Sequence, residues 1–175
     1  VEHLINAFHR DDQILDADGF ASLEGRLDAL RARKAPTILL PHEGELGRLL
    51  GISSEAVVAD RFTRVREAAL ASGAVVLLKG ACSMIAEANG TVDVTVVDAG
   101  SPSLATAGSG DVLAGVVAAL ACHLPPRRAA ELGAQLHGLA GASWSEENAD
   151  RGLLAHEIAD RIGYGDPNRF GGPGA

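Results

Sequence analysis

Aromatic residues are scarce in this sequence: they make up 3 % of its 175 residues, although 47 % of the chain is apolar. A hydrophobic core with so few rings has to be built from Val, Leu, Ile and Ala side chains that pack at close range. A chain of this length forms one domain, or most of one, and is long enough to bury such a core.

Basic residues are also few, since 15 Lys and Arg stand against 23 Asp and Glu and give a net charge of −8. Binding to nucleic acid or to an anionic membrane surface depends on clustered positive charge, so this balance argues against both partners. A phosphorylated ligand would have to be attracted locally, by backbone amides or by one or two lysines.

The two cysteines, Cys82 and Cys122, match neither a disulfide framework nor a CxxC metal spacing. No leader peptide or long apolar run is recognisable, which predicts a cytoplasmic protein. The chain does not begin with Met, and its first residues, "VEHLINAF", have a helical pattern. We therefore expect an excerpt of a longer protein.

Short apolar runs alternate with longer amphipathic segments along the chain. Two of these runs, separated by Asn89-Gly90, predict a β-hairpin with a tight turn. Strands are expected at 13–18, 37–40, 74–80, 83–88 and 91–97, and helices at 20–33, from 43, at 53–72, from 109, at 127–147 and at 153–162. This alternation predicts an α/β fold, with helices on both faces of a mostly parallel central sheet. We expect this domain to span residues 1–163, followed by a flexible tail at 164–175 that is rich in Gly and Pro.

The stretch Ala105–Gly115, "ATAGSGDVLAG", places a glycine-rich loop directly before a helix. Amides at a helix start attract anions, and glycine lets a phosphate approach them closely. The sequence contains neither a GxxxxGK[ST] phosphate loop nor, at this position, a GxGxxG dinucleotide motif. Asp111 follows the predicted anion hole. It either caps the helix or accepts a proton from a hydroxyl while the amides hold a transferred phosphoryl group.

Five blocks, "LDADGF", "PHEGELGRLLG", "VVLLKGACSMIA", "SPSLATAGSGDVLAGVVAAL" and "HGLAGA…RGLLAHEIA", resemble the ADP-dependent NAD(P)H-hydrate dehydratases in order and spacing. That family is part of the ribokinase-like superfamily, so the resemblance implies a three-layer αβα domain. It implies dehydration of the S epimer of NADHX or NADPHX back to NAD(P)H, with ADP as phosphoryl donor and release of AMP and phosphate. The chemistry implied is phosphorylation of the hydrate's hydroxyl, followed by elimination.

The resemblance also implies roles for individual residues. Asp111 would contact the substrate and deprotonate its hydroxyl, and His42 would contact the hydrated nicotinamide. Glu45 would organise Mg²⁺ and its waters indirectly. The adenine nucleotide would be bound by two segments: Lys79, Gly80, Ala81, Cys82 and Ser83 in the first, and Gly108, Ser109 and Gly110 in the second.

The sequence departs from the family pattern at several positions: Leu40 replaces Thr, Glu43 replaces Pro, Ser83 replaces Thr and Ala107 replaces Gly. The family's N-terminal portion is expected to be missing, which leaves one strand of the sheet without its neighbour. We therefore expect an N-terminally truncated ribokinase-like domain with little activity alone. It should aggregate, self-associate through that edge as a homo-oligomer, or depend on a separate N-terminal piece.

Structural roles remain open for the same residues. His42 could be a polar loop residue, Glu45 a first-turn acid favoured by the helix dipole, and Lys79 a solvated strand-end lysine. Asp16 and Asp18 could cap the following helix, and His137 is expected to be structural. Two other functions also remain open: a ribokinase-like kinase for a vitamin precursor or another small alcohol, and an inactive nucleotide-binding fragment.

Overall fold

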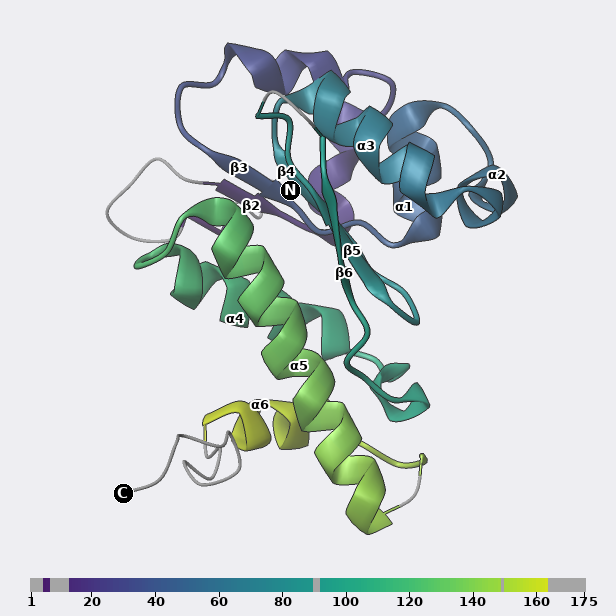
Figure 1. Cartoon of the computed structure of the whole chain (residues 1–175), viewed down its shortest axis with the longest axis vertical. Coiled ribbons are helices and arrows are strands. Elements are labelled where there is room, and N and C mark those ends of the chain that lie inside the picture. The colour runs from purple at the N-terminus through teal and green to yellow at the C-terminus, as the bar shows by residue number, and fades with distance from the viewer. Residues whose placement is uncertain (1–4, 7–12, 90–91, 149, 164–175) are drawn as a thin grey trace.

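The structure, a computed structural model, describes residues 5–6, 13–89, 92–148 and 150–163 (Figure 1). These residues form six strands in one sheet, and the order of the strands in the sheet is their order in the sequence. The strands are β1 (Ile5–Asn6), β2 (Gln13–Leu15), β3 (Thr37–Leu39), β4 (Val75–Leu78), β5 (Ser83–Ala86) and β6 (Val94–Val97).

The centre of the sheet is parallel. Ile14 of β2 pairs with Ile38 of β3, and Leu39 of β3 pairs with Val76 of β4. Strand β5 is antiparallel to both β4 and β6, so β6 runs in the same direction as β2, β3 and β4. At the other edge β1 is antiparallel to β2, with Ile5 opposite Ile14. Four of the six described strands therefore share one direction, as the predicted mostly parallel sheet requires.

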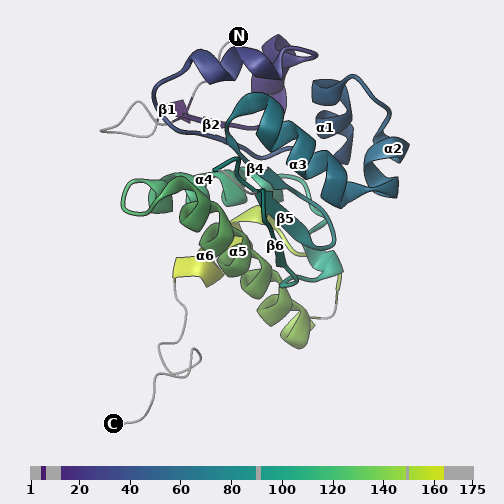
Figure 2. The same cartoon turned by 45° about the horizontal axis from the view of Figure 1, so that its top comes forward.

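Helices cover both faces of the sheet, which gives the three layers expected from the sequence (Figures 1 and 2). One outer layer contains the 3₁₀ helices η1 (Ala17–Leu23) and η2 (Leu27–Ala32) with α1 (Glu43–Leu50), α2 (Ser54–Ala59) and α3 (Arg61–Ser72). The other contains η3 (Pro102–Leu104), α4 (Ser109–Ala121), α5 (Pro126–Asn148) and α6 (Ala155–Gly163).

Successive strand residues point into different cores. Leu39 and Val76 pack with the helices of the first layer, whereas Ile38 and Leu77 pack against α4 and α5. The strands are apolar on both faces because both faces are covered. A third, smaller core around Trp144 joins α5 to α6.

The helix expected at 20–33 is wrong. The structure has two 3₁₀ helices there, η1 and η2, separated around Gly25. Gly25 adopts a left-handed conformation with φ +65°, which ends the first helix and turns the chain. Leu27 and Leu30 of η2 still point into the core, so the apolar pattern marked buried positions but not the type of helix.

The single helix expected at 53–72 is also wrong, because the chain breaks at Asp60 with φ −151° and ψ 66°. The Asp60 carboxylate accepts a hydrogen bond from the Thr63 amide (3.2 Å) and so caps a new helix, α3. Val58 and Phe62 are consequently 60 % and 50 % exposed instead of lying on a buried face. The end of α3 is as predicted, since Gly73 is its C-cap with φ +70°.

Four further expectations concern the ends of the chain and the edges of the sheet. The β5–β6 hairpin is present, with Ala86 opposite Val94, whereas the tight turn expected at Asn89-Gly90 lies partly outside the described residues. The helical pattern of the first residues is wrong at Ile5–Asn6, which form β1. Because β1 pairs with β2, the prediction that the edge of β2 would be left without a neighbour is wrong. The predicted tail at 164–175 lies outside the described residues.

Among the residues described, no helix is both long and apolar enough to cross a membrane.

Candidate active site

The carboxyl ends of three neighbouring parallel strands bring polar side chains to one edge of the sheet. Asp16 directly follows β2, His42 comes shortly after β3, and Lys79 directly follows β4. The Lys79 amide donates to the carbonyl of Pro41 (2.8 Å), and the Leu40 amide donates to the carbonyl of Leu15 (3.0 Å). These bonds hold the strand ends together, and ligands of open α/β sheets bind at this edge.

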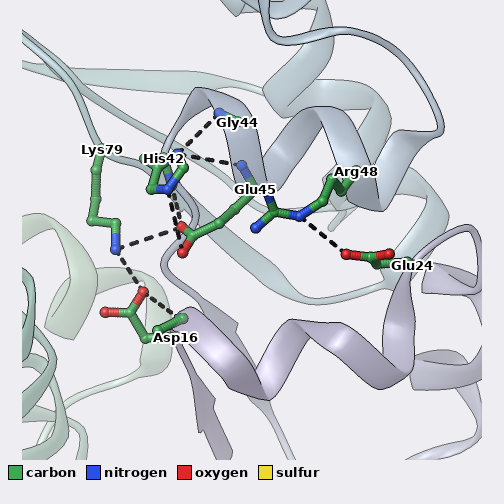
Figure 3. A network of polar contacts seen from close by, with 8 residues as sticks. Asp16, Glu24, His42, Gly44, Glu45, Arg48 and Lys79 are labelled. Carbon is green, nitrogen blue, oxygen red and sulfur yellow. Dashed lines mark hydrogen bonds and ion pairs between the residues drawn. The ribbon is translucent and has the colours of Figure 1, made fainter.

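Lys79 lies between two carboxylates (Figure 3). Its Nζ atom is 2.5 Å from Oδ1 of Asp16 and 3.8 Å from Oε2 of Glu45. The side chains of Lys79, Asp16 and Glu45 are 20 %, 14 % and 7 % exposed. Lys79 is therefore not the solvated strand-end lysine that the sequence left open. It is the ammonium of a largely buried charge cluster.

Asp16 caps η1 and belongs to this cluster at the same time. Its Oδ1 accepts a hydrogen bond from the Ala17 amide (2.9 Å) as well as the contact from Lys79. Burial raises the pKa of the Asp16 carboxyl above its usual value, although Lys79 and the Ala17 amide act in the opposite direction. The site therefore holds a carboxylate whose charged form is poorly solvated.

His42 and Glu45 form a capping box at the start of α1. The Nδ1 atom of His42 accepts hydrogen bonds from the amides of Gly44 (2.9 Å) and Glu45 (3.3 Å), while Oε2 of Glu45 accepts from the His42 amide (2.7 Å). These bonds fix both side chains at the strand end. Half of the His42 side chain remains exposed, so its ring is available to a ligand while Glu45 is buried.

The start of α4 faces the same cluster. Gly108 is its N-cap, with φ +83° and no side chain to cap the helix. Among the described residues, no acceptor bonds to the amides of Gly110 and Asp111. A Cβ atom built on Gly110 would lie 3.6 Å from Nζ of Lys79 and 3.7 Å from Oδ2 of Asp16. The predicted anion hole and Lys79 thus lie side by side, which is the arrangement that a phosphate requires.

Asp111 is the third residue of α4 and is exposed to solvent. It is not the helix cap, because that position belongs to Gly108. It makes no hydrogen bond or ion pair with any residue that the structure describes. Asp111 lies in the first turn of α4, where the helix dipole favours negative charge.

Of the segment Lys79–Ser83, Lys79 reaches the cluster and the residues after it lead away. Gly80 lies against the side chains of Arg61 and Glu43, and the thiol of Cys82 donates to Oδ1 of Asp98 (3.0 Å). That hydrogen bond raises the pKa of the Cys82 thiol, so the thiol keeps its proton. Cys82 and Cys122 are both free, in agreement with the sequence analysis. A nucleotide contact at Gly80, Ala81, Cys82 and Ser83 stays a prediction.

The hydroxyl of Ser109 contacts a histidine on α5. Its Oγ atom lies 3.0 Å from Nε2 of His137 on α5, and the same ring nitrogen is 3.0 Å from the Ser109 carbonyl oxygen. Burial lowers the pKa of His137, so the ring is neutral near pH 7. In this structure His137 joins α5 to the first residue of α4, in keeping with its predicted structural role.

The described residues contain no group of three or more His, Cys, Asp or Glu arranged to hold a metal ion. The two carboxylates of the cluster, on Asp16 and Glu45, are both turned toward the Lys79 ammonium. This donor set fits a Mg²⁺ ion held mainly by phosphate oxygens and water, since Mg²⁺ keeps several waters and rarely binds in an all-protein cage.

Two residues of this site, Asp16 and Arg61, were not predicted from the sequence as binding residues. Asp16 had a local signal, because it directly follows a predicted strand, although its ion pair with Lys79 had none. Arg61 carried no such signal, because a continuous helix at 53–72 would have made it an ordinary helix residue. The break at Asp60 instead makes Arg61 the first residue of α3 and turns it toward the loop after Lys79.

A mixed α/β sheet between two helical layers, with a glycine-rich helix start at the strand ends, is the ribokinase-like arrangement. A solved ribokinase-like superfamily protein from Enterococcus faecalis matches this fold with a TM-score of 0.67. It is 22 % identical and is matched over 85 % of this chain and 50 % of its own.

The family is shown by sequence. The NAD(P)H-hydrate dehydratase family pattern matches residues 2–163, and the chain belongs to that family. The bifunctional NAD(P)H-hydrate repair enzyme Nnr of Moorella thermoacetica is 40 % identical over 152 residues, which are 86 % of this chain and 28 % of that enzyme.

A solved structure of the ADP/ATP-dependent NAD(P)H-hydrate dehydratase from Bacillus subtilis, co-crystallised with ATP and Mg²⁺, matches with a TM-score of 0.77 and 31 % identity. The match covers 90 % of this chain and 55 % of that one. The chain spans 50 % and 55 % of two curated single-function dehydratases, about half of their length.

Proposed function

We propose that this protein takes part in nicotinamide nucleotide repair, by ADP-dependent dehydration of the S epimer of NADHX or NADPHX to NAD(P)H with release of AMP and phosphate. The observation that carries the proposal is the meeting of the uncapped start of α4 with Lys79, beside His42 and Glu45, in a chain of the dehydratase family. The Bacillus subtilis structure, co-crystallised with ATP and Mg²⁺, supports nucleotide use.

In this proposal the phosphates of ADP lie at the start of α4. The free amides of Gly110 and Asp111 donate to phosphate oxygens, and the Lys79 ammonium adds a positive charge within reach of the same oxygens. Gly108 and Ser109 shape the turn, and the segment Gly80–Ser83 binds the rest of the nucleotide.

The hydrated nicotinamide lies between His42 and Asp111. The hydroxyl oxygen of the hydrate attacks the terminal phosphorus of ADP, Asp111 takes the hydroxyl proton, and AMP leaves as its bond to that phosphorus breaks. The phosphorylated intermediate then undergoes elimination: its carbon–oxygen bond to phosphate breaks, the neighbouring ring carbon gives up a proton to solvent, and the double bond of NAD(P)H forms between the two carbons. A carboxylate beside an anion hole has this use in phosphoryl transfer, whereas a site that only bound phosphate would be weakened by it.

Mg²⁺ enters this proposal with the nucleotide. Asp16, Glu45 and Asp111 carry more negative charge than Lys79 balances, so an ADP molecule without a metal ion would meet repulsion. Glu45 is the residue proposed to organise the waters of the ion. When bound, the ion neutralises phosphate charge.

The test is recovery of the reduced-nicotinamide absorbance from the S epimer of NADPHX, with protein expressed from its complete reading frame, ADP and Mg²⁺. Recovery that requires ADP and yields AMP supports the proposal. Phosphorylation of a small alcohol by ATP without any recovery would support a kinase instead. Nucleotide binding without turnover of either kind would contradict both and indicate an inactive binding module.

A further inference from the structure

Arg61 joins three separate parts of the chain next to Lys79 of the candidate active site. Its Nη2 atom donates to the carbonyl oxygens of Lys79 (3.2 Å) and Cys82 (3.0 Å). Its Nε atom lies 3.2 Å from Oε1 of Glu43, the first residue of α1 and the neighbour of His42. One guanidinium therefore ties the start of α1 and the start of α3 to the loop between β4 and β5.

These contacts are sheltered from water. The side chains of Arg61 and Glu43 are 17 % and 27 % exposed. A hydrogen bond from a charged donor to a carbonyl is stronger than one between neutral groups, and it is screened little when water is largely excluded. Both carbonyls are bonded by Nη2, while Nε pairs with Glu43 by charge and makes no hydrogen bond among the described residues. A lysine carries one ammonium and cannot occupy both positions.

Gly80 provides an independent view of the same arrangement. A Cβ atom built on Gly80 would fall on Nη2 of Arg61 and would lie 2.8 Å from Oε1 of Glu43. The glycine thus leaves the space that the guanidinium fills. A side chain at this position would force the Arg61 guanidinium or the Glu43 carboxylate to shift.

We propose that Arg61 is a positioning residue for nucleotide binding, an inference that rests on the proposed function. By holding both ends of the segment Lys79–Cys82, it fixes the backbone from which the Lys79 side chain extends to the cluster beside Gly110. Through Glu43 it keeps this segment in register with the start of α1, which carries His42. Arg61 acts through these groups and does not touch the phosphates itself.

The test measures ADP affinity by calorimetric titration and steady-state kinetics for Arg61→Lys, in protein expressed from its complete reading frame. We expect ADP affinity to fall about tenfold, as for the loss of one charge-assisted hydrogen bond. The KM for ADP should rise by a similar factor while kcat changes little. The matched control is Arg64→Lys one turn later on α3, where the arginine pairs with Glu67; its ADP affinity should equal that of the wild type.

Two further variants test the inference if Arg61→Lys does not fold. Gly80→Ala should weaken ADP binding because it forces Arg61 or Glu43 to shift, and Glu43→Gln should do so to a smaller degree because it removes the ion pair. Wild-type ADP affinity in the folded variants would overturn the role of Arg61. If the wild type itself neither binds ADP nor restores NADPH, the proposed function fails first and the role of Arg61 fails with it.

Discussion

The ammonium of Lys79 and the carboxylate of Asp16 lie 2.5 Å apart, although 63 residues separate them in the sequence. The pair connects the ends of β2 and β4 across the end of β3, which lies between them in the sheet. It also borders Gly110 at the start of α4. An ion pair in this position sets the charge that an incoming phosphate meets.

The Asp16 carboxyl should make the stability of the protein depend on pH. Its pKa is raised in the folded state, so between its usual value of 3.8 and the raised value the folded chain binds more protons than the unfolded chain. Stability therefore falls as pH rises through this window, by at most about 1.4 kcal/mol per pH unit.

Urea unfolding of the wild type and of Asp16→Asn over a series of pH values will test this. The free energy of unfolding of the wild type, relative to Asp16→Asn, should be highest at about pH 4 and below, and should decline as pH rises through this window. A relative stability that rises with pH would mean that Lys79 outweighs the cost of burial at Asp16.

His137 should produce a pH dependence of the opposite sign. Burial lowers its pKa, so just below the usual value of 6.5 the unfolded chain takes up a proton that the folded chain does not. The protein should therefore lose stability as pH falls below about 6.5, by up to about 1.4 kcal/mol per unit.

The measurement compares thermal or urea unfolding of the wild type and His137→Gln between neutral and mildly acidic pH. The variant should lack this part of the acid destabilisation. His156→Gln is the control because His156 is exposed on α6, and it should follow the wild-type profile. Equal acid sensitivity in all three proteins would contradict the assignment.

Gly110→Val should weaken ADP binding sharply. The Cβ atom itself would meet Lys79 and Asp16 at ordinary contact distances of 3.6 and 3.7 Å, but the two methyl groups of valine would extend into the space where phosphate oxygens meet the amides. Calorimetric titration with ADP checks this. Gly115→Val is the matched control, since Gly115 lies on the same helix with no atom within 4 Å of an added Cβ. Unchanged affinity in Gly110→Val would place the phosphates elsewhere.

The sequence was sufficient for those parts of the fold that depend on local patterns. Apolar runs located β2, β3 and β4, and Gly73 marked the end of α3, because a strand covered on both faces and a left-handed helix cap each leave a clear signal. The breaks at Gly25 and Asp60 were missed, since a single turn residue competes with a longer amphipathic pattern and its effect depends on tertiary packing.

The features of the candidate site also fall into two groups: those that local patterns predict and those that they do not. His42, Glu45, Lys79 and Gly110 could be selected in advance because each follows a strand or begins a helix. The ion pair between Lys79 and Asp16, and the bonds of Arg61 to the loop after β4, could not be predicted. Both join segments that are distant in the sequence, and only the packing of the folded chain brings them together.

Asp111→Asn should retain ADP binding and lose about two to four orders of magnitude in turnover of NADPHX, the usual contribution of a positioned general base. The amide keeps the shape of the carboxylate and removes its capacity to accept the hydroxyl proton. The amides of Gly110 and of residue 111 are unchanged, so the anion hole remains intact. Loss of the first-turn charge should lower the free energy of unfolding by about 0.3–1 kcal/mol.

Single-turnover kinetics with saturating ADP and Mg²⁺ measures the chemical step separately from ADP binding. Asp28→Asn removes an exposed carboxylate on η2 and is the control for the change in net charge; it should turn over like the wild type. A loss of ADP affinity in Asp111→Asn would assign the residue to binding. Turnover near the wild-type rate would show that Asp111 serves only the helix dipole, and the proposed proton transfer would then have to be assigned to another group.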